Sequence, residues 1–453
     1  MSEWLIPVVP VIEMNATCPS DGFLLKPIRL IIPGIHCLAE TKCEKCNQTF
    51  YRDFPIGHSL WAPATINISK KELIDPLNMD WYNKTLFDAY LNQNNENIVP
   101  VVHKYCLYKK IVIINCLDFI YGHSLLKLLN VQYYLDNYKE IGVCVIAPTA
   151  IMHLIPDGVA EIWELKVPFK KMMQWFTSLE CWISEKVKQY DEVFLSPVFS
   201  HPNNHNYDIN RFISSEVQIP DVSNSLQPVI LFVYREDRLW GKSIQQQNAN
   251  IVSLYKKLKR IFPMMTFVII GFGKRNNRDI IDTSVIDLRT DFITVEQELK
   301  WIAYMRITDC AIGVHGSNML LPTGYARSVV ELVPFGRYGN VVQDFLFANN
   351  RSDIRDVLLN YKLIYGNNML TDVKPLRVVD LVVSNLSFSK INSKWFTTIL
   401  DNKELLPILD SDIYKRCVQY LTKRRGLVDN LTFRFIIKKT KKIILKIMDK
   451  RGI

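Results

Sequence analysis

Short apolar runs alternate with longer amphipathic stretches through the middle of the chain. Runs such as KKIVIINC (109–116) and IGVCVIAP (141–148) are rich in β-branched residues and have the length of strands. Between such runs, residues 123–138 and 169–190 repeat apolar positions at helical spacing. Strands that alternate with amphipathic helices indicate a parallel sheet covered by helices. We therefore predict an α/β, Rossmann-like domain over residues 106–220.

The same alternation restarts after the polar stretch 201–227. The elements expected in this second series are, in chain order, strand 228–234, helix 247–262, strand 265–271, helix 294–305, strand 309–314 and strand 328–334. A second series with its own apolar positions predicts a second Rossmann-like domain over residues 221–390. Two such sheets facing one cleft would give a GT-B-like architecture.

The two ends of the chain differ from its middle. Residues 1–105 mix short apolar runs with Pro and Asn, so we expect an irregular segment packed on the first domain. Residues 391–453 are expected to form helices that end in a basic amphipathic tail. Residues 434–451 place Lys between apolar positions spaced by three and four, which suits either an anionic membrane surface or a helix docked on the core.

Charge and composition narrow the functional classes. The chain has 453 residues, 48% of them hydrophobic and 22% charged, which is typical of globular domains. Of its net charge of +10, +9 lies within residues 423–451, where eleven Lys or Arg accompany two Asp. No aromatic residues interleave with the lysines of residues 438–450, so nucleic acid is not an expected partner. No uninterrupted apolar stretch has spanning length, and the first residues lack a secretory pattern, so we expect a cytoplasmic protein, peripheral on the inner face of the membrane if the tail binds lipid.

The best candidate for a ligand site is the segment DCAIGVHGSNMLLPTGYARSVVELVP. An apolar strand ends at Gly313 and is followed by the turn Val314–His315–Gly316, after which Ser317 or Asn318 is expected to cap a helix. Gly316 permits close approach of the backbone, and a helix N-terminus favours negative charge. A diphosphate would fit this environment, although a capped strand–turn–helix is also a common structural unit.

The run GVHGSNMLLPTGYARSVVELVPFG resembles the signature segment of glycosyltransferase family 61. The matching residues are His315, Gly316, Ser317, Pro322, Gly324 and Glu331. The family's Asn a few positions into the helix has no clear counterpart. The resemblance extends over about residues 110–350 and includes the YREDRLW turn, where Arg235 and Arg238 stand in the positions of the family's arginines. It implies a bacterial-type cytoplasmic glycosyltransferase with nucleotide-sugar and glycan substrates.

In the first half, the run LDFIYGHSLLKLLNVQYYLDNY resembles a helix start of the same family. His123 stands in the position of the family's histidine, whereas Lys127 stands where an acidic residue is usual. The resemblance implies an inverting displacement, in which a base removes the proton of the acceptor hydroxyl. His123 is our first candidate for this base and Asp118 is the second; a core or capping histidine is the structural alternative.

The resemblance also gives roles to the residues of the second half. Arg235, Arg238, His315, Gly316, Ser317 and Asn318 would hold the donor diphosphate, and Glu331 would hold ribose hydroxyls or the base. Exposed turn arginines and a strand-end glutamate are the alternatives. No Asp-x-Asp pair lies in a suitable loop, so no cofactor is expected and dependence on a divalent metal is left open.

Two further alternatives concern zinc and function. Cys37, Cys43 and Cys46 lie within HCLAETKCEKC, and Cys18 or His36 would complete a zinc site with them. Free cysteines are the alternative that a single C-x-x-C favours.

Another two-domain transferase, such as a pyruvyl-transferase-like enzyme of polysaccharide modification, would share the architecture. A non-catalytic, membrane-associated glycan-binding protein of the same fold is the alternative from a different class.

Overall fold

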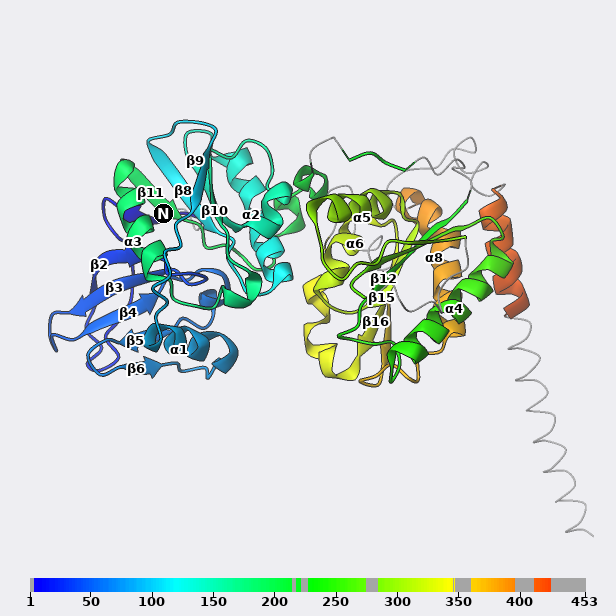
Figure 1. Cartoon of the computed structure of the whole chain (residues 1–453), viewed down its shortest axis with the longest axis horizontal. Helices are drawn as coiled ribbons and strands as arrows, with labels where there is room; N and C mark the ends of the chain where they lie inside the picture. Colours follow the sequence, from blue (N-terminus) through cyan, green and yellow to red (C-terminus); the bar gives the residue numbers. More distant parts are fainter. Residues whose placement is uncertain are drawn as a thin grey trace, which may run out of the picture. The chain divides into compact units, whose positions relative to one another are not determined.

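The computed structural model describes residues 4–213, 217–220, 227–273, 284–344, 346, 360–395 and 411–424. The chain divides into two compact units, Met1–Glu216 and Val217–Ile453, and the division falls within the polar stretch 201–227. Each unit contains helices and a sheet with a parallel centre (Figure 1). The prediction of an α/β protein with parallel sheets is therefore confirmed. The GT-B-like cleft between two domains stays a prediction.

The first unit is built around a mixed six-stranded sheet with the order β1-β11-β8-β9-β10-β7. Its strands are β1 (Ile6–Val9), β7 (Val101–Lys104), β8 (Lys110–Asn115), β9 (Gly142–Pro148), β10 (Glu161–Leu165) and β11 (Glu192–Leu195). The four inner strands are parallel, and β1 and β7 are antiparallel at the edges. After its first residue β8 is buried throughout, as expected for a strand covered on both faces. Strand order reverses between β8 and β11, which is where ligands bind in open parallel sheets.

A second sheet in this unit corrects our expectation for the N-terminal segment. Residues 25–74 form a five-stranded antiparallel sheet, not an irregular segment. Its strands, in their order in the sheet, are β2 (Leu25–Ile31), β3 (Leu38–Cys43), β4 (Thr49–Asp53), β5 (Thr65–Asn67) and β6 (Glu72–Ile74). Each strand pairs with the next one along the chain, but the strands are short and their polar residues are partly buried, as Thr65 and Asn67 of β5 are, so no regular alternation of apolar and polar positions marks them in the sequence. The helix α1 (Thr85–Leu91) packs against this sheet through Leu86.

The second unit contains a fully parallel six-stranded sheet with the order β14-β13-β12-β15-β16-β17. Its strands are β12 (Val229–Tyr234), β13 (Thr266–Gly271), β14 (Val285–Asp287), β15 (Cys310–Val314), β16 (Val329–Pro334) and β17 (Tyr361–Gly366). In chain order this is the 3-2-1-4-5-6 arrangement of a Rossmann sheet, whose order reverses between β12 and β15. The reversal brings the ends of the two strands that carry Arg235 and His315 side by side.

Helices cover both units. The helices of the first unit are α1, α2 (Tyr121–Asn137) and α3 (Thr177–Lys186); those of the second are α4 (Ile244–Ile261), α5 (Val295–Ile307), α6 (Leu320–Tyr325) and α8 (Pro375–Trp395). Figure 1 shows α4 and α8 on one face of the second sheet and α5 and α6 on the other. Leu254 and Leu258 of α4 are fully buried in this layer, so truncating either to Ala is expected to cost about 2–5 kcal/mol.

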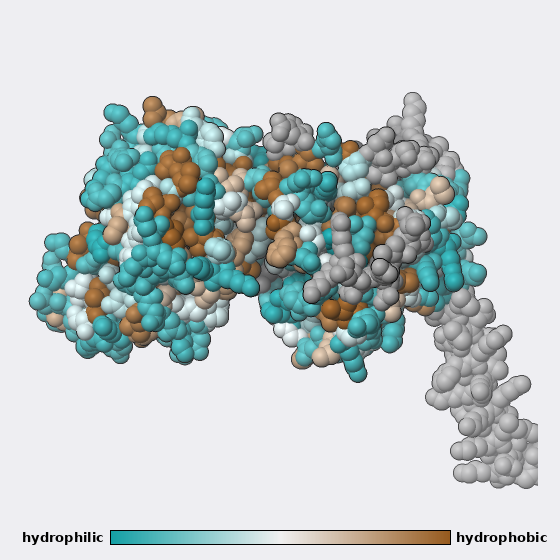
Figure 2. All heavy atoms as spheres, viewed as in Figure 1, coloured by the Kyte–Doolittle hydropathy of each residue, from teal (hydrophilic) through white to brown (hydrophobic). Residues whose placement is uncertain are grey.

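One helix prediction needs correction. The stretch 169–190 is α-helical only over α3, because Met172, Trp175 and Phe176 are buried in the segment before it. At the other end of the chain, residues 412–424 are helical and Cys417 packs into the core of the second unit. The predicted tail, 434–451, lies outside the described residues. Within the described part of the chain, no helix combines the length and apolar character needed to cross a bilayer, and the visible surface is mainly hydrophilic with separate hydrophobic patches (Figure 2).

Candidate functional site

In the first unit, polar side chains gather beyond the ends of β8 and β11, where the strand order reverses. Asp118 follows β8 by three residues, and His123 and Lys127 lie on the first two turns of α2. His58 comes from a short 3-10 helix, Gly57–Leu60, whose first backbone N–H donates to the carbonyl of Pro197 after β11 at 2.8 Å. We call His58, Asp118, His123 and Lys127 the His123 cluster.

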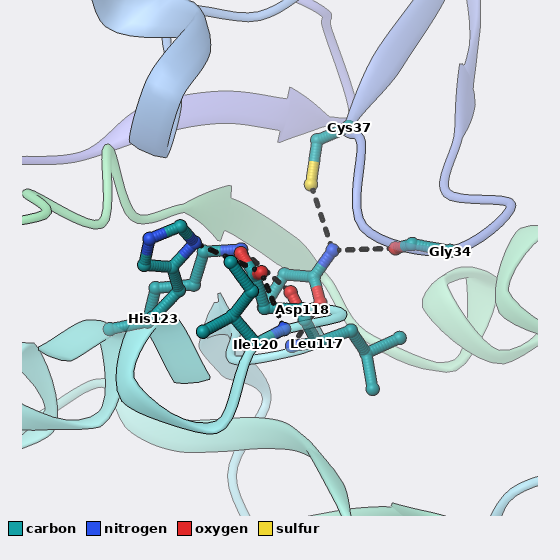
Figure 3. A network of polar contacts seen from close by, with 8 residues as sticks. Gly34, Cys37, Leu117, Asp118, Ile120 and His123 are labelled. Carbon is teal, nitrogen blue, oxygen red and sulfur yellow. Dashed lines mark hydrogen bonds and ion pairs between the residues drawn. The ribbon is translucent and has the colours of Figure 1, made fainter. Parts of the chain in front are cut away.

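Asp118 is the centre of the His123 cluster. Its carboxylate is fully buried; Oδ1 lies 3.2 Å from His123 Nδ1 and accepts from the backbone N–H of Ile120 at 3.1 Å, and Oδ2 lies 2.9 Å from Lys127 Nζ. Figure 3 shows the imidazole of His123 turned toward Asp118. Burial opposes ionisation, but the charge of Lys127 and the bond from His123 outweigh it and hold the pKa of Asp118 well below its usual value. An ionised Asp118 is a poor proton acceptor, so it orients His123 and does not suit the role of base.

The tautomer of His123 follows from this contact. Because ionised Asp118 can only accept, His123 Nδ1 carries the proton and Nε2 keeps its lone pair. The His123 side chain is 23% exposed, so an acceptor hydroxyl can reach the ring. Lys127, which stands in the position of an expected acid, is 5% exposed and also donates to the carbonyl of Leu117 at 2.6 Å. Lys127 therefore compensates the charge of Asp118.

Aromatic residues surround the histidines of this cluster. The centre of the Trp81 ring lies 5.0 Å from that of His58 and 6.4 Å from that of His123, and Trp61 lies 6.4 Å from His58. Trp61 and Trp81 are 62% and 45% exposed, which is unusual for tryptophan. Burial, followed by the nearby His123 and Lys127, lowers the pKa of His58 to about 3, so His58 is neutral. The accessible indole rings of Trp61 and Trp81 therefore lie near the neutral His58, and Trp81 also lies near His123, which bonds to Asp118.

The His123 cluster also contains a possible metal-ligating set. Ligand atoms of His58, Asp118 and His123 lie within 4.8 Å of one another. A divalent cation there would lie beside the buried ammonium of Lys127, which already neutralises Asp118. The arrangement therefore suits proton transfer by His123 better than metal binding.

In the second unit, both predicted arginines lie against the bend Val314–Gly316, which we call the Gly316 bend. Arg235 Nη1 and Arg238 Nη1 donate to the carbonyl oxygen of His315, at 3.3 and 2.8 Å. Arg235 is 5% exposed and also forms a two-bond pair with Asp237, at 2.7 and 2.5 Å. Burial opposes ionisation of Asp237, but its hydrogen bonds with Arg235 lower its pKa. Arg235 is therefore fixed in place, and the half-buried Arg238 is the more accessible guanidinium.

Gly316 is required by the geometry of this bend. Its φ of 144° is disfavoured for residues with a side chain, and a Cβ would overlap Nη1 of Arg235 and of Arg238. The expected helix start needs correction here. Gly316 itself precedes a 3-10 turn formed by Ser317–Met319, and α6 begins only at Leu320. Neither Ser317 nor Asn318 forms a side-chain cap.

The predicted role of Glu331 is also corrected by its position. Glu331 lies inside β16 and is fully buried, so ribose hydroxyls cannot reach its carboxylate. Its Oε1 lies 2.8 Å from His315 Nδ1, and its Oε2 accepts from the hydroxyl of Tyr361 on β17. The side chain of His315 is 2% exposed. Glu331 and Tyr361 therefore hold His315, whose carbonyl in turn receives the arginines.

Some predicted site residues that are far apart in the sequence lie together in the structure, whereas the predicted zinc ligands do not all meet. Arg235, Arg238, His315 and Gly316 meet at one bend, and Asp118 meets His123. Cys37 lies 3.5 Å from the side-chain amide of Asn115 and apart from Cys43 and Cys46, and His36 pairs with Asp53 at 3.0 Å. The residues that sequence reasoning missed are His58, Trp61, Trp81, Asp237 and Tyr361. His58, Trp61, Trp81 and Tyr361 reach their sites from distant segments, so no spacing signals them, whereas Asp237 lies in the same turn as Arg235.

The known structures that resemble this chain have low sequence identity to it and low TM-scores. No protein-family model and no curated protein sequence matches the chain. Its structural neighbours include the ADP-heptose LPS heptosyltransferase II of E. coli, at 12% identity and a TM-score of 0.35, covering 61% of this chain and 98% of that one. A family 9 glycosyl transferase from Veillonella parvula has 7% identity and a TM-score of 0.39, covering 62% and 98%. The wall teichoic acid polymerase TagF has 11% identity and a TM-score of 0.25, covering 75% and 94%.

These scores describe a distant resemblance in backbone arrangement. The named neighbours are glycosyltransferases and a polymerase of wall teichoic acid. Membership of glycosyltransferase family 61 stays a prediction.

Proposed function

We propose that the chain is a glycosyltransferase that moves a sugar from a nucleotide-sugar donor to a hydroxyl of a glycan acceptor, with inversion at the anomeric carbon. One observation supports this proposal most strongly. Two arginines converge on a glycine bend at the point where a 3-2-1-4-5-6 parallel sheet reverses its order, which is where such sheets bind phosphate-containing ligands.

The donor diphosphate would bind at the Gly316 bend through Arg238. A guanidinium group matches the geometry of phosphate oxygens and stays charged at any physiological pH. Arg235, held by Asp237 and by the His315 carbonyl, would act as a positioning residue and contribute positive potential. The absence of a side chain at Gly316 lets both guanidinium groups lie directly against the bend. Negative charge grows on the leaving diphosphate in the transition state, so fixed positive groups at this place would accelerate the transfer.

His315, Ser317, Asn318 and Glu331 take indirect roles in this proposal. His315 is buried with Glu331 and Tyr361, so its imidazole shapes the bend and its carbonyl orients the arginines. Ser317 and Asn318 are half-buried and follow Gly316 directly. Their side chains cap no helix, which leaves them available to the donor. We therefore place the direct contacts on Arg238, Gly316, Ser317 and Asn318.

The acceptor hydroxyl would give its proton to Nε2 of His123. Asp118 fixes the tautomer that exposes this lone pair and stabilises the ring when the proton arrives. The exposed rings of Trp61 and Trp81 provide flat apolar surfaces beside His123, on which the apolar face of a sugar can pack. The base in this proposal is therefore His123, the first candidate from the sequence, and Asp118, the second candidate, orients it. In this scheme Lys127 keeps Asp118 ionised.

The transferase assignment is tested with purified full-length protein and a panel of UDP-, GDP-, CMP- and ADP-sugars. Release of free nucleotide and transfer to a glycan mixture are measured together. Replacing Arg238 by Ala is expected to lower turnover on the order of 10²–10³-fold, and His123→Ala on the order of 10²–10⁴-fold. Arg260→Ala, at an exposed end of α4, and His103→Ala, at another histidine–carboxylate pair, are matched controls. Unchanged product formation in both site variants would rule out these roles.

A further inference from the structure

Two turns in the antiparallel part of the first unit bring three thiols and one carboxylate together. The first turn is Cys18-Pro-Ser-Asp21, and the second is Cys43-Glu-Lys-Cys46 at the end of β3. The sulfur atoms of the three cysteines and a carboxylate oxygen of Asp21 all lie within 4.8 Å of one another. We call these four residues the thiol cluster.

The two turns of the thiol cluster have the same backbone design. In the first, Gly22 N donates to the carbonyl of Cys18 at 2.9 Å, and in the second, Asn47 N donates to the carbonyl of Cys43 at 2.9 Å. Gly22 and Asn47 each follow the last side chain of the turn and each have a positive φ, of 71° and 60°. The side chains at the first and fourth positions of both turns therefore point to one centre. This repeated turn is the form in which paired C-x-x-C units hold zinc.

The distances match a tetrahedral zinc site. Four ligands at a Zn–S distance of about 2.3 Å are separated by about 3.7 Å, and a sulfur and a carboxylate oxygen by about 3.6 Å. Cys18 Sγ lies 3.6 Å from Cys46 Sγ, and Cys43 Sγ lies 3.5 and 3.6 Å from the two oxygens of Asp21. The sulfur pair is well beyond the length of a disulfide bond, about 2.05 Å. Both kinds of ligand pair are therefore already at the separation that zinc requires.

Ordinary core packing does not explain this arrangement. Cys18 and Cys43 are buried, but Cys46 and Asp21 are half-buried at the edge of the cluster. An aspartate directed at a thiol gains nothing from apolar packing; the carboxylate of Asp21 accepts from the backbone N–H of Phe23 at 2.9 Å and otherwise faces the thiol of Cys43. The apolar cluster below is small and consists of Ala16, Cys18, Leu25, Cys43 and Phe50. A metal ion would both compensate Asp21 and hold together an end of the sheet that has few apolar contacts.

We propose that Cys18, Asp21, Cys43 and Cys46 bind one structural Zn²⁺. This set differs from the one that the sequence suggested, because Cys37 and His36 belong to other contacts and the fourth ligand is an aspartate from the first turn. Four protein ligands complete the tetrahedron, so the site is closed and holds the N-terminal sheet. The proposal is independent of the transferase assignment.

The first test is the metal content of the full-length protein purified from zinc-supplemented medium without chelating tags. We expect elemental mass spectrometry to find one zinc per chain in the wild type and a zinc content near zero in Cys18→Ser and Cys43→Ser. Cys181→Ser, at an exposed cysteine elsewhere, and Cys37→Ala are matched controls that should keep one zinc. Equal zinc in the Cys43→Ser variant and the wild type would overturn the proposal.

A second test does not depend on the variants folding. Wild-type protein refolded with Co²⁺ in place of Zn²⁺ should show visible bands of a tetrahedral ion and a charge-transfer band with the intensity of three thiolate ligands. Asp21→Asn should retain the charge-transfer band, because it keeps the thiolates, and should release the metal to a chelator faster. A wild-type protein without zinc and without these bands, or one with a Cys18–Cys46 disulfide in mass spectra, would contradict the site.

Discussion

Asp118 is buried with a lysine on one oxygen and a histidine on the other, so its charge is a structural element as well as the group that orients His123 in the proposed mechanism. Replacing it by Asn would leave the Lys127 ammonium buried at 5% exposure without its partner. We expect Asp118→Asn to lower the free energy of unfolding by about 3–5 kcal/mol, because breaking a buried pair strands the remaining charge. Chemical denaturation measures this change. The double variant Asp118→Asn/Lys127→Met should be less destabilised, and a loss below about 1 kcal/mol in the single variant would contradict the buried pair.

His58 gives the protein a pH dependence of known sign. Its pKa falls from 6.5 to about 3 in the folded chain, with burial as the largest cause. Between these two values the unfolded chain binds a proton at His58 that the folded chain does not, so stability falls as the pH falls from about 6.5 toward 3. The slope contributed is up to about 1.4 kcal/mol per pH unit. A plot of the free energy of unfolding against pH, from chemical denaturation at a series of pH values, should be less steep in this window for His58→Gln than for wild type.

At the scale of elements, the Gly316 bend joins β15 to the turn before α6 and brings the arginines to the end of the sheet. Gly316→Ala adds a methyl group where Nη1 of Arg235 and of Arg238 now lie, at a φ that alanine avoids. We expect weaker nucleotide binding together with a cost of about 1–3 kcal/mol in stability from the backbone strain. Titration calorimetry and thermal unfolding check the two effects. Gly339→Ala, at a glycine with open space around it, is the matched control and should change neither.

The elements with continuous apolar runs could be predicted from the sequence, and the short strands without a regular pattern could not. β8 and β12 are buried throughout, apart from the first residue of β8, so their runs of Ile, Val, Leu and Phe are visible in the sequence. The antiparallel sheet 25–74 was missed although each of its strands pairs with the next one along the chain, because the strands are short. Its strands also alternate apolar and polar residues irregularly, as LKPIRLI does, and Pro27 interrupts the register of β2.

The candidate sites were predictable to a similar degree. The Gly316 bend lies directly after an apolar strand, so its sequence signal is local, and Arg235 lies directly after another. The burial of Glu331 was not predictable, since the bond to Tyr361 joins it to a strand 30 residues later. Half of the thiol cluster could be predicted from the sequence, because C-x-x-C marks the second turn. The fold alone brings Cys18 and Asp21 to that turn.

At the scale of the whole molecule, the chain combines a unit in which His123 bonds to Asp118 and a unit whose Gly316 bend we propose as the diphosphate site. The basic segment 434–451 lies outside the described residues, and its sequence suggests contact with anionic lipid. Full-length protein should sediment with vesicles that contain phosphatidylglycerol more than with neutral vesicles, and added salt should weaken the binding. A chain that ends after residue 424 should lose this preference. Equal sedimentation of both chains would show that the tail is not the lipid contact.

The central claim is that a pyrophosphate binds at the Gly316 bend. A crystal structure of the full-length protein with a bound nucleoside diphosphate, chosen from UDP, GDP, CDP and ADP by affinity, tests it most directly. Phosphate oxygens are expected within hydrogen-bonding distance of the Arg238 guanidinium and of the backbone N–H of Gly316 or Ser317. A nucleotide bound elsewhere in the chain, with Arg238 still donating to the carbonyl of His315 and not to a phosphate, would contradict this binding site.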